Sequence, residues 1–127
     1  MGTGPGTDLK ILSQYYNVIG SDFSQHFLDI LVEKNISSEL LLLDAITLNT
    51  EDMFDCIYSN KVLQHLTEDE LMQSIHNQNQ RLNPDGIICH SFWAGEDSYE
   101  MKGSLHNYHT KEELEQWFSP FYKIFHL

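Results

Sequence analysis

The first 22 residues, MGTGPGTDLKILSQYYNVIGSD, decide the fold, because a glycine-rich loop is followed by a helical pattern and a short strand. Gly2, Gly4 and Gly6 permit positive φ and a close approach of a ligand to the backbone. A helix expected over Asp8–Tyr16 offers unpaired N–H donors at its start. The strand Asn17–Asp22 ends in a carboxylate about 20 residues after the loop, a spacing at which an acid accepts hydrogen bonds from ribose.

Helical patterns recur along the rest of the chain. Ser24 is expected to cap a helix, and capping boxes formed by Thr67 with Glu70 and by Thr110 with Glu113 mark two more. The Thr67 helix should run to about Leu82, and Pro120 should end the last helix. The apolar stripe of the Ser24 helix consists of Phe27, Leu28, Leu31 and Val32.

Apolar runs between these helices predict the strands. The expected strands are Leu40–Asp44, Phe54–Ser59, Gly86–Trp93 and Phe121–Leu127. The first of them is expected to be buried on both faces. A turn at Asn83–Gly86 precedes the third, and a long polar loop over 94–109 follows it. Alternating strands and helices predict an α/β fold, with a doubly wound, mostly parallel sheet and helices on both faces. The chain length indicates a single domain over 1–127.

The composition excludes several classes of partner. The 127 residues carry 7 Lys and Arg against 19 Asp and Glu, a net charge of −12, which disfavours nucleic acids and anionic membranes. No apolar run reaches the roughly 18 residues that span a bilayer, and the start lacks signal-peptide features, so a cytoplasmic protein is expected. Cys56 and Cys89 lie in apolar runs and are interpreted as buried core thiols, not as a disulfide or metal site.

Six motifs in order resemble the class I S-adenosylmethionine-dependent methyltransferases, in particular the small-molecule branch, over nearly the whole chain. They are Gly2–Gly6, Val18–Ser24, Leu43–Ala45, Phe54–Leu66, Arg81–Gly86, and Asn107–Thr110 with Glu112–Leu114. The resemblance implies a Rossmann-like methyltransferase fold and S-adenosylmethionine as the cofactor.

The resemblance also implies which residues bind this cofactor. Gly2, Gly4 and Gly6 would pass close to its methionine part, and Asn60 would lie beside the methionyl and sulfonium end. Asp22 would hold the ribose. Phe23 would pack on the adenine, and Asp44 and the Ala45 backbone would bind the adenine amino group. A sulfonium cation is favoured near carboxylates and carbonyl dipoles, in agreement with this assignment.

The sequence gives a less specific signal for the residues that would bind the methyl acceptor. Trp93, Tyr108 and His109 are candidates for lining the acceptor pocket, although a strand-terminal Trp is more commonly a core residue. His65 stands where the family often has a histidine, and a packed, hydrogen-bonded role competes there with that of a base. No catalytic residue is assigned. His106 and His109 lack a third ligand nearby, so no metal site is expected.

The resemblance is incomplete at both ends of the chain. The family has an apolar central strand before the glycine loop, but Met1 directly precedes Gly2, and a further antiparallel strand is missing after Leu127. Unpaired backbone groups on the two neighbouring strands would each cost on the order of 1–3 kcal/mol. A homo-oligomer or a strand-exchanged dimer is therefore expected. An internal Met1, with the native start further upstream, is the alternative explanation.

Three functions remain open at this point. The first is a methyltransferase that acts on a small-molecule acceptor. The second is a non-catalytic remnant that serves as a binding or assembly module. A nicotinamide-dependent dehydrogenase is a third, weaker possibility, because it shares the glycine loop and the ribose acid but needs a catalytic Tyr–Lys or Cys pair that the sequence does not show.

Overall fold

A computed structural model describes residues 1–34, 38–94, 98–101 and 104–124. The side chains of Trp93 and of the strand residues 98–101 and 104–108 lie outside this description. The chain divides into two compact units, 1–45 and 46–127, which are described separately below.

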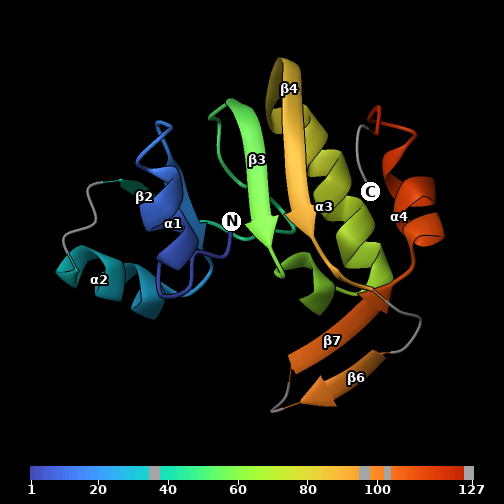
Figure 1. The fold of residues 1–127 in the computed structure, drawn as a ribbon, viewed down its shortest axis with the longest axis horizontal. Helices are drawn as coiled ribbons and strands as arrows, with labels where there is room; N and C mark the ends of the chain where they lie inside the picture. The colour runs from blue at the N-terminus through green and yellow to red at the C-terminus, as the bar shows by residue number, and fades with distance from the viewer. Residues whose placement is uncertain (35–37, 95–97, 102–103, 125–127) are drawn as a thin grey trace. The chain divides into compact units, whose positions relative to one another are not determined.

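The first unit consists of two helices and a two-stranded parallel sheet (Figure 1). In chain order its elements are α1 (Thr7–Leu12), β1 (Ile19–Asp22), α2 (Gln25–Glu33) and β2 (Glu39–Leu42). Strands β1 and β2 run parallel in a register that places Asp22 opposite Leu42. The Ser24 hydroxyl accepts from the Phe27 amide and caps α2, as the sequence predicts.

The helices of this unit bury one small core. Leu9 of α1 and Leu28 and Leu31 of α2 form a buried cluster, against which Val18 and Leu40 pack. Gly20 of β1 lies beneath α1, where an added Cβ would come within 2.9 Å of a Leu9 methyl carbon. The absence of a side chain at this position therefore allows α1 to approach the sheet closely.

The second unit contains the remaining elements, and its main sheet is the parallel pair β3–β4 (Figure 1). In chain order they are β3 (Phe54–Asn60), the 3-10 turn η1 (Leu63–His65), α3 (Glu68–Arg81), β4 (Leu82–Ser91), β5 (Trp93–Ala94), β6 (Ser98–Met101), β7 (Ser104–His109) and α4 (Lys111–Phe118). Strand β7 pairs antiparallel with β6 and parallel with β5.

Helix α3 begins where the sequence predicts. The Thr67 side chain accepts from the Glu70 amide, and the Glu70 carboxylate accepts from the Thr67 amide, which completes the capping box. Leu71 and Ile75 of α3 are fully buried. In the described residues no helix is long and apolar enough to cross a membrane.

The expectation of buried cysteines is wrong. Cys56 and Cys89 are free and exposed. The register pairs Cys56 with Ile87 and Tyr58 with Cys89, so both thiols point to one face of β3–β4, whereas α3 hydrogen-bonds to His90, whose side chain lies on the opposite face. An apolar run alone does not reveal which of its residues a helix covers.

Two elements of the first unit are shorter or more exposed than expected. Helix α1 ends at Leu12 instead of Tyr16, because the Ser13 hydroxyl donates to the Leu9 carbonyl and the chain turns there. Strand β2 ends at Leu42, which is 56% exposed, so the prediction of a strand buried on both faces is wrong. In α2 only Leu28 and Leu31 of the expected stripe are buried; Phe27 and Val32 are exposed.

The second unit also departs from the expected elements. The stretch expected as a long polar loop contains the hairpin β6–β7, whose backbone ladder needs no apolar pattern. The expected turn at Asn83–Gly86 lies inside β4, where Asp85 has a φ of 65° and the register with β3 shifts. After α4, residues 121–124 form no strand, since the amides of Phe121 and Tyr122 donate to the Phe118 carbonyl. The rest of the expected final strand, 125–127, lies outside the described residues.

Candidate functional site

The glycine loop is built into the first unit by backbone hydrogen bonds. The Thr3 amide donates to the Ser21 carbonyl of β1 (3.0 Å), and the Gly6 amide donates to the Thr3 carbonyl (2.9 Å). Gly4 and Gly6 have φ values of 49° and 87°, a region that side chains rarely occupy. Gly6 is also the N-cap of α1, so the loop leads directly into that helix.

Asp22 connects this loop to the end of β1. Its Oδ2 accepts from the Gly4 amide at 2.9 Å, and its Oδ1 accepts from the Ser24 amide at 2.9 Å. An ionised carboxylate has about four acceptor sites, so each oxygen can still accept a further hydrogen bond. The side chain is thus fixed in orientation and retains capacity for a ligand's hydroxyl groups.

Space and apolar surface lie beside this carboxylate. A Cβ added to Gly4 would meet nothing within 4 Å, so there is room next to the loop. Phe23, which directly follows Asp22, is 73% exposed, and the buried Thr3 hydroxyl has no hydrogen-bond partner among the described residues. An open loop, an oriented carboxylate and an exposed aromatic ring fit a ligand that contains a ribose and a flat base.

Asp44 and Ala45 belong to the same unit. The Leu43 amide donates to the Asp22 carbonyl at 3.0 Å, which brings the end of β2 next to the end of β1. Asp44 and Ala45 follow directly and are partly buried. The structure therefore gathers the cofactor-side candidates Gly2, Gly4, Gly6, Asp22, Phe23, Asp44 and Ala45 within residues 1–45.

Asn60, the remaining cofactor-side candidate, lies in the second unit at the carboxyl end of β3. Its Oδ1 accepts from the Ser91 hydroxyl at 2.5 Å, and the same hydroxyl accepts from the Lys61 amide at 2.9 Å. Lys61 has a φ of 56°, so the chain turns sharply after the strand. These bonds hold the carboxyl ends of β3 and β4 together.

A polar relay that the sequence analysis missed lies in the interior of this unit. The Ser59 Oγ and His90 Nδ1 are 2.7 Å apart, and the His90 Nε2 and Gln78 Oε1 are 2.6 Å apart. The Gln78 Nε2 donates in turn to the Ser74 Oγ at 3.0 Å. Two polar residues four positions apart on the buried face of α3 were the signal in the sequence that could have revealed it.

The relay fixes the protonation of His90. The amide oxygen of Gln78 can only accept, so the His90 Nε2 carries the proton and its Nδ1 accepts from the Ser59 hydroxyl. Burial disfavours the charged ring and lowers the pKa of His90 to about 3. A serine beside a histidine can be a nucleophile, but Ser59 is only 1% exposed, which assigns the relay a structural role.

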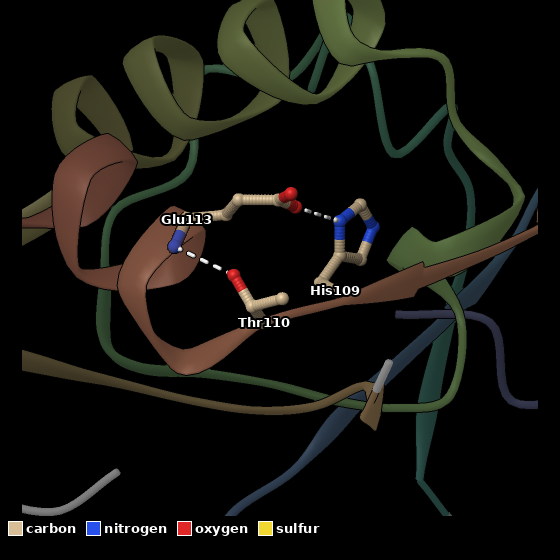
Figure 2. Close-up of polar contacts among 3 residues, drawn as sticks. All are labelled: His109, Thr110 and Glu113. Atoms are coloured by element: carbon tan, nitrogen blue, oxygen red, sulfur yellow. Dashed lines mark hydrogen bonds and ion pairs between the residues drawn. The ribbon is translucent and has the colours of Figure 1, made fainter. Parts of the chain in front are cut away.

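His109 lies at the end of β7, and its ring is 6% exposed. Its Nδ1 is 3.5 Å from the Glu113 Oε2, and the Thr110 hydroxyl accepts from the Glu113 amide at 3.1 Å (Figure 2). The rings of Phe92 and Trp117 contact the imidazole edge to face, with centroids at 5.4 and 5.3 Å. His109 is therefore held firmly next to the start of α4.

The other acceptor-side candidates are only partly described. Trp93 and Tyr108 are paired in the β5–β7 ladder, and their side chains lie outside the described residues, as does that of His106. His65 is exposed on η1. Among the residues that the structure describes, no group of three or more His, Cys, Asp or Glu side chains could hold a metal ion.

Comparison with known proteins gives a consistent result. The family model of the methyltransferase domain matches residues 1–86. No curated protein sequence matches the chain significantly. Solved structures with a similar fold include CalS10, an amino pentose methyltransferase of Micromonospora echinaspora from calicheamicin biosynthesis, at 17% identity and a TM-score of 0.76, covering 94% of this chain and 71% of that one.

Two further structures share the fold. The 1,6-didemethyltoxoflavin-N1-methyltransferase of Burkholderia thailandensis, solved with S-adenosylhomocysteine, is 21% identical with a TM-score of 0.76, and the match covers 94% of this chain and 56% of that one. TehB of Haemophilus influenzae is 20% identical with a TM-score of 0.69, and the match covers 93% of this chain and 43% of that one. This chain thus spans between 43% and 71% of the length of these three proteins.

The fold is the Rossmann-like α/β fold of these enzymes, as the sequence predicts. Its glycine loop, Asp22 and β2 all fall inside the segment that the family model matches. Because that segment, 1–86, makes up more than half of the sequence, the chain belongs to the methyltransferase domain family.

Proposed function

We propose that this chain binds S-adenosylmethionine and transfers its methyl group to a small-molecule acceptor. The observation that carries the proposal is the pair of hydrogen bonds from the Gly4 and Ser24 amides to Asp22. They orient a carboxylate beside an open glycine loop and the exposed Phe23 ring, an arrangement suited to an adenosine.

Each cofactor-side residue then has a distinct task. The bound cofactor supplies a methyl group that is activated by its cationic sulfur. Gly2, Gly4 and Gly6 would admit the methionine part, and Asn60 would lie toward the methionyl end. Asp22 would accept hydrogen bonds from the ribose hydroxyls. Phe23 would pack on the adenine, and Asp44 and Ala45 would contact the adenine amino group. Much of the acceleration comes from holding the nucleophile and the methyl carbon in line.

The acceptor is proposed to be small because the relatives act on small molecules. CalS10 acts on an amino pentose, and the Burkholderia enzyme was solved with 1,6-didemethyltoxoflavin bound. Trp93, Tyr108 and His109 are proposed to line the acceptor side, since the β5–β7 ladder pairs Trp93 with Tyr108 and continues to His109.

We further propose that the chain is cytoplasmic and associates with itself. Cys56 and Cys89 are free and exposed on one sheet face, which suits a reducing compartment. Among the described strands, β1 pairs only with β2, and β3 pairs only with β4. Each pair therefore has open edges at which a strand of a second copy can add, as in a strand-exchanged dimer.

Replacing Asp22 by Asn tests the cofactor proposal. Asn has the same size as Asp but carries no charge, and an NH2 group replaces one of the two acceptor oxygens. A charge-assisted hydrogen bond to the ribose is therefore lost. We expect the Kd for S-adenosylhomocysteine to rise roughly 10- to 100-fold, since hydrogen bonds to charged groups contribute about 1.5–3 kcal/mol. Isothermal titration calorimetry on the purified chain measures the change.

Asp29→Asn is the matched control. Asp29 is an exposed acid on α2 of the same unit and accepts only from the Gln25 side chain at 2.9 Å among the contacts described. Its replacement should leave the Kd unchanged. Equal Kd values for wild type and Asp22→Asn, or no binding by a folded wild-type chain, would contradict the proposal and favour a non-catalytic module.

A further inference from the structure

The second unit carries two thiols that the proposed methyl transfer does not use. Cys56 of β3 and Cys89 of β4 are both free and exposed. Ile57 and Ser59, which alternate with Cys56 along β3, are buried on the opposite face of the sheet. The two cysteines therefore share the exposed face of the parallel pair β3–β4 (Figure 1).

The register of the two strands sets the spacing of the thiols. Cys56 pairs with Ile87, and Tyr58 pairs with Cys89, so the two cysteines are diagonal neighbours on the ladder. With strands about 4.8 Å apart and a rise of about 3.3 Å per residue, their Cα atoms lie about 8 Å apart. Partial burial raises the pKa of the Cys56 thiol, and the nearby Cys89 raises it further. The two sulfur atoms are thus close enough to interact.

This spacing disfavours a disulfide and suits a shared metal ion. A disulfide requires Cα atoms within about 7 Å of each other, and a longer spacing demands movement of the backbone. Two thiolates that bind one ion through metal–sulfur bonds of about 2.3 Å need to approach only to about 4.6 Å. Side chains in strands lean along the strand direction, so Cys56 and Cys89 can reach this separation while the ladder stays intact.

The number of ligands selects the kind of ion. Structural Zn²⁺ sites and Fe–S clusters take four protein ligands. Within the described part of the chain, no group of three or more His, Cys, Asp or Glu side chains could hold a metal ion. Soft thiolates favour Cu(I), a closed-shell ion that two ligands in line can satisfy. The net charge of −12 attracts such a cation to the chain.

We propose that Cys56 and Cys89 together form a two-thiolate binding site for a soft monovalent metal ion, Cu(I). On binding, two S–Cu bonds form, the two thiol protons pass to the solvent, and the copper stays Cu(I). The cation also removes the repulsion between two neighbouring thiolates. The site uses none of the cofactor-side residues, so the inference does not depend on the proposed function.

A competition titration of the full chain tests the site. Cu(I) is supplied without oxygen as its bicinchoninate complex, and the loss of the coloured complex reports transfer of copper to the protein. We expect one Cu(I) per chain. Cys56→Ser and Cys89→Ser should each weaken binding by at least roughly 100-fold, the upper end of what loss of a mere supporting residue costs.

Ile87→Ser is the matched control. Ile87 is 53% exposed and pairs with Cys56 on the same face, so this variant introduces the same serine without removing a thiol. It should keep the wild-type affinity and stoichiometry. X-ray absorption at the copper edge should show two sulfur neighbours in wild type, and an equal concentration of Zn²⁺ should not displace the copper.

Three results would overturn the inference. The first is an unchanged Cu(I) affinity in either single-cysteine variant. The second is one Cu(I) per two chains, which would mean that copper bridges two copies. The third is rapid formation of a Cys56–Cys89 disulfide when the folded chain is mildly oxidised, detected by alkylation and mass spectrometry, because the thiols would then be a redox pair. A separate titration with S-adenosylhomocysteine tests the proposed function, whose outcome is independent of all three.

Discussion

His90 is neutral in the folded chain because of its burial and its two hydrogen-bond partners. The Ser59 hydroxyl donates to Nδ1, and the Gln78 amide oxygen accepts from Nε2, so the neutral ring is fully satisfied. Desolvation lowers the pKa of His90 from 6.5 to about 3. The same residue in the unfolded chain titrates near its ordinary value, and this difference links folding to pH.

The stability of the chain should therefore fall in acid. Between pH 6.5 and about 3 the unfolded chain binds one more proton than the folded chain at His90, so stability rises with pH in this window. The contribution is complete above about pH 6.5 and is lost as the pH falls toward 3, with a limiting slope of about 1.4 kcal/mol per pH unit. Urea denaturation at a series of pH values measures this slope for wild type and for His90→Gln.

His90→Gln should flatten the slope relative to wild type, because the variant has no imidazole at this site. His76→Gln, on the exposed face of α3, is the control for losing one imidazole elsewhere. If the two variants change the slope equally, the relay does not hold His90 neutral.

At the scale of elements, the first unit depends on the close approach of α1 to β1. Gly20 lies at this contact, and an added Cβ would lie 2.9 Å from Leu9 and 3.1 Å from both Leu40 and Thr3. Thr3 is part of the glycine loop and donates its amide to Ser21 of the same strand. The packing of the helix and the conformation of the loop are therefore coupled.

Gly20→Ala should impair both the packing of α1 and the conformation of the glycine loop. The extra methyl group crowds the side chains of Leu9 in α1 and Thr3 in the loop, which must shift, and overpacking of this kind costs roughly 1–3 kcal/mol. We expect a lower thermal midpoint together with weaker binding of S-adenosylhomocysteine, measured by scanning calorimetry and titration. Asn17→Ala, at an exposed residue just before β1, is the control and should change neither quantity. An unchanged affinity in a destabilised Gly20→Ala chain would show that helix and loop are independent.

At the scale of the whole molecule, we predict that the open strand edges promote association of the chain with a second copy. Strands β1 and β3 each have a single strand partner in the described part of the chain. Exposed edges present unpaired N–H and C=O groups that pair readily with another chain. We expect light scattering on a sizing column to give at least twice the 14.8 kDa of one chain. A stable, cooperatively folding species of 14.8 kDa would contradict this.

Local chemistry made much of this molecule predictable. The Thr67 and Ser24 caps and the end of a strand at Asp22 depend on neighbouring residues, and the sequence alone located them, although this strand begins at Ile19 and not at Asn17. The burial of Cys56 and Cys89 was mispredicted because it depends on which face of the strand α3 covers. These are tertiary properties, which local patterns do not encode.

The residues of the candidate site were likewise predictable only where their interactions depend on local sequence. The connection of Asp22 to the glycine loop follows from a spacing known for such folds, so its residues could be named in advance. The burial of Gln64 and the Ser59–His90 hydrogen bond could not be predicted, because a buried polar residue looks like a surface residue until its neighbours are known. The hairpin β6–β7 was missed because the many polar residues of this stretch predict a loop, whereas the pairing of the two strands depends on backbone hydrogen bonds.

The relay in the second unit has a direction as well as a set of contacts. The Ser59 hydroxyl donates to His90, His90 donates to Gln78, and Gln78 donates to Ser74, so every donor points the same way. Dipoles aligned head to tail polarise one another in a medium of low dielectric constant. The row therefore behaves as a fixed electric dipole whose electron-rich end is the Ser59 oxygen, one residue before the carboxyl end of β3, and this end attracts positive charge.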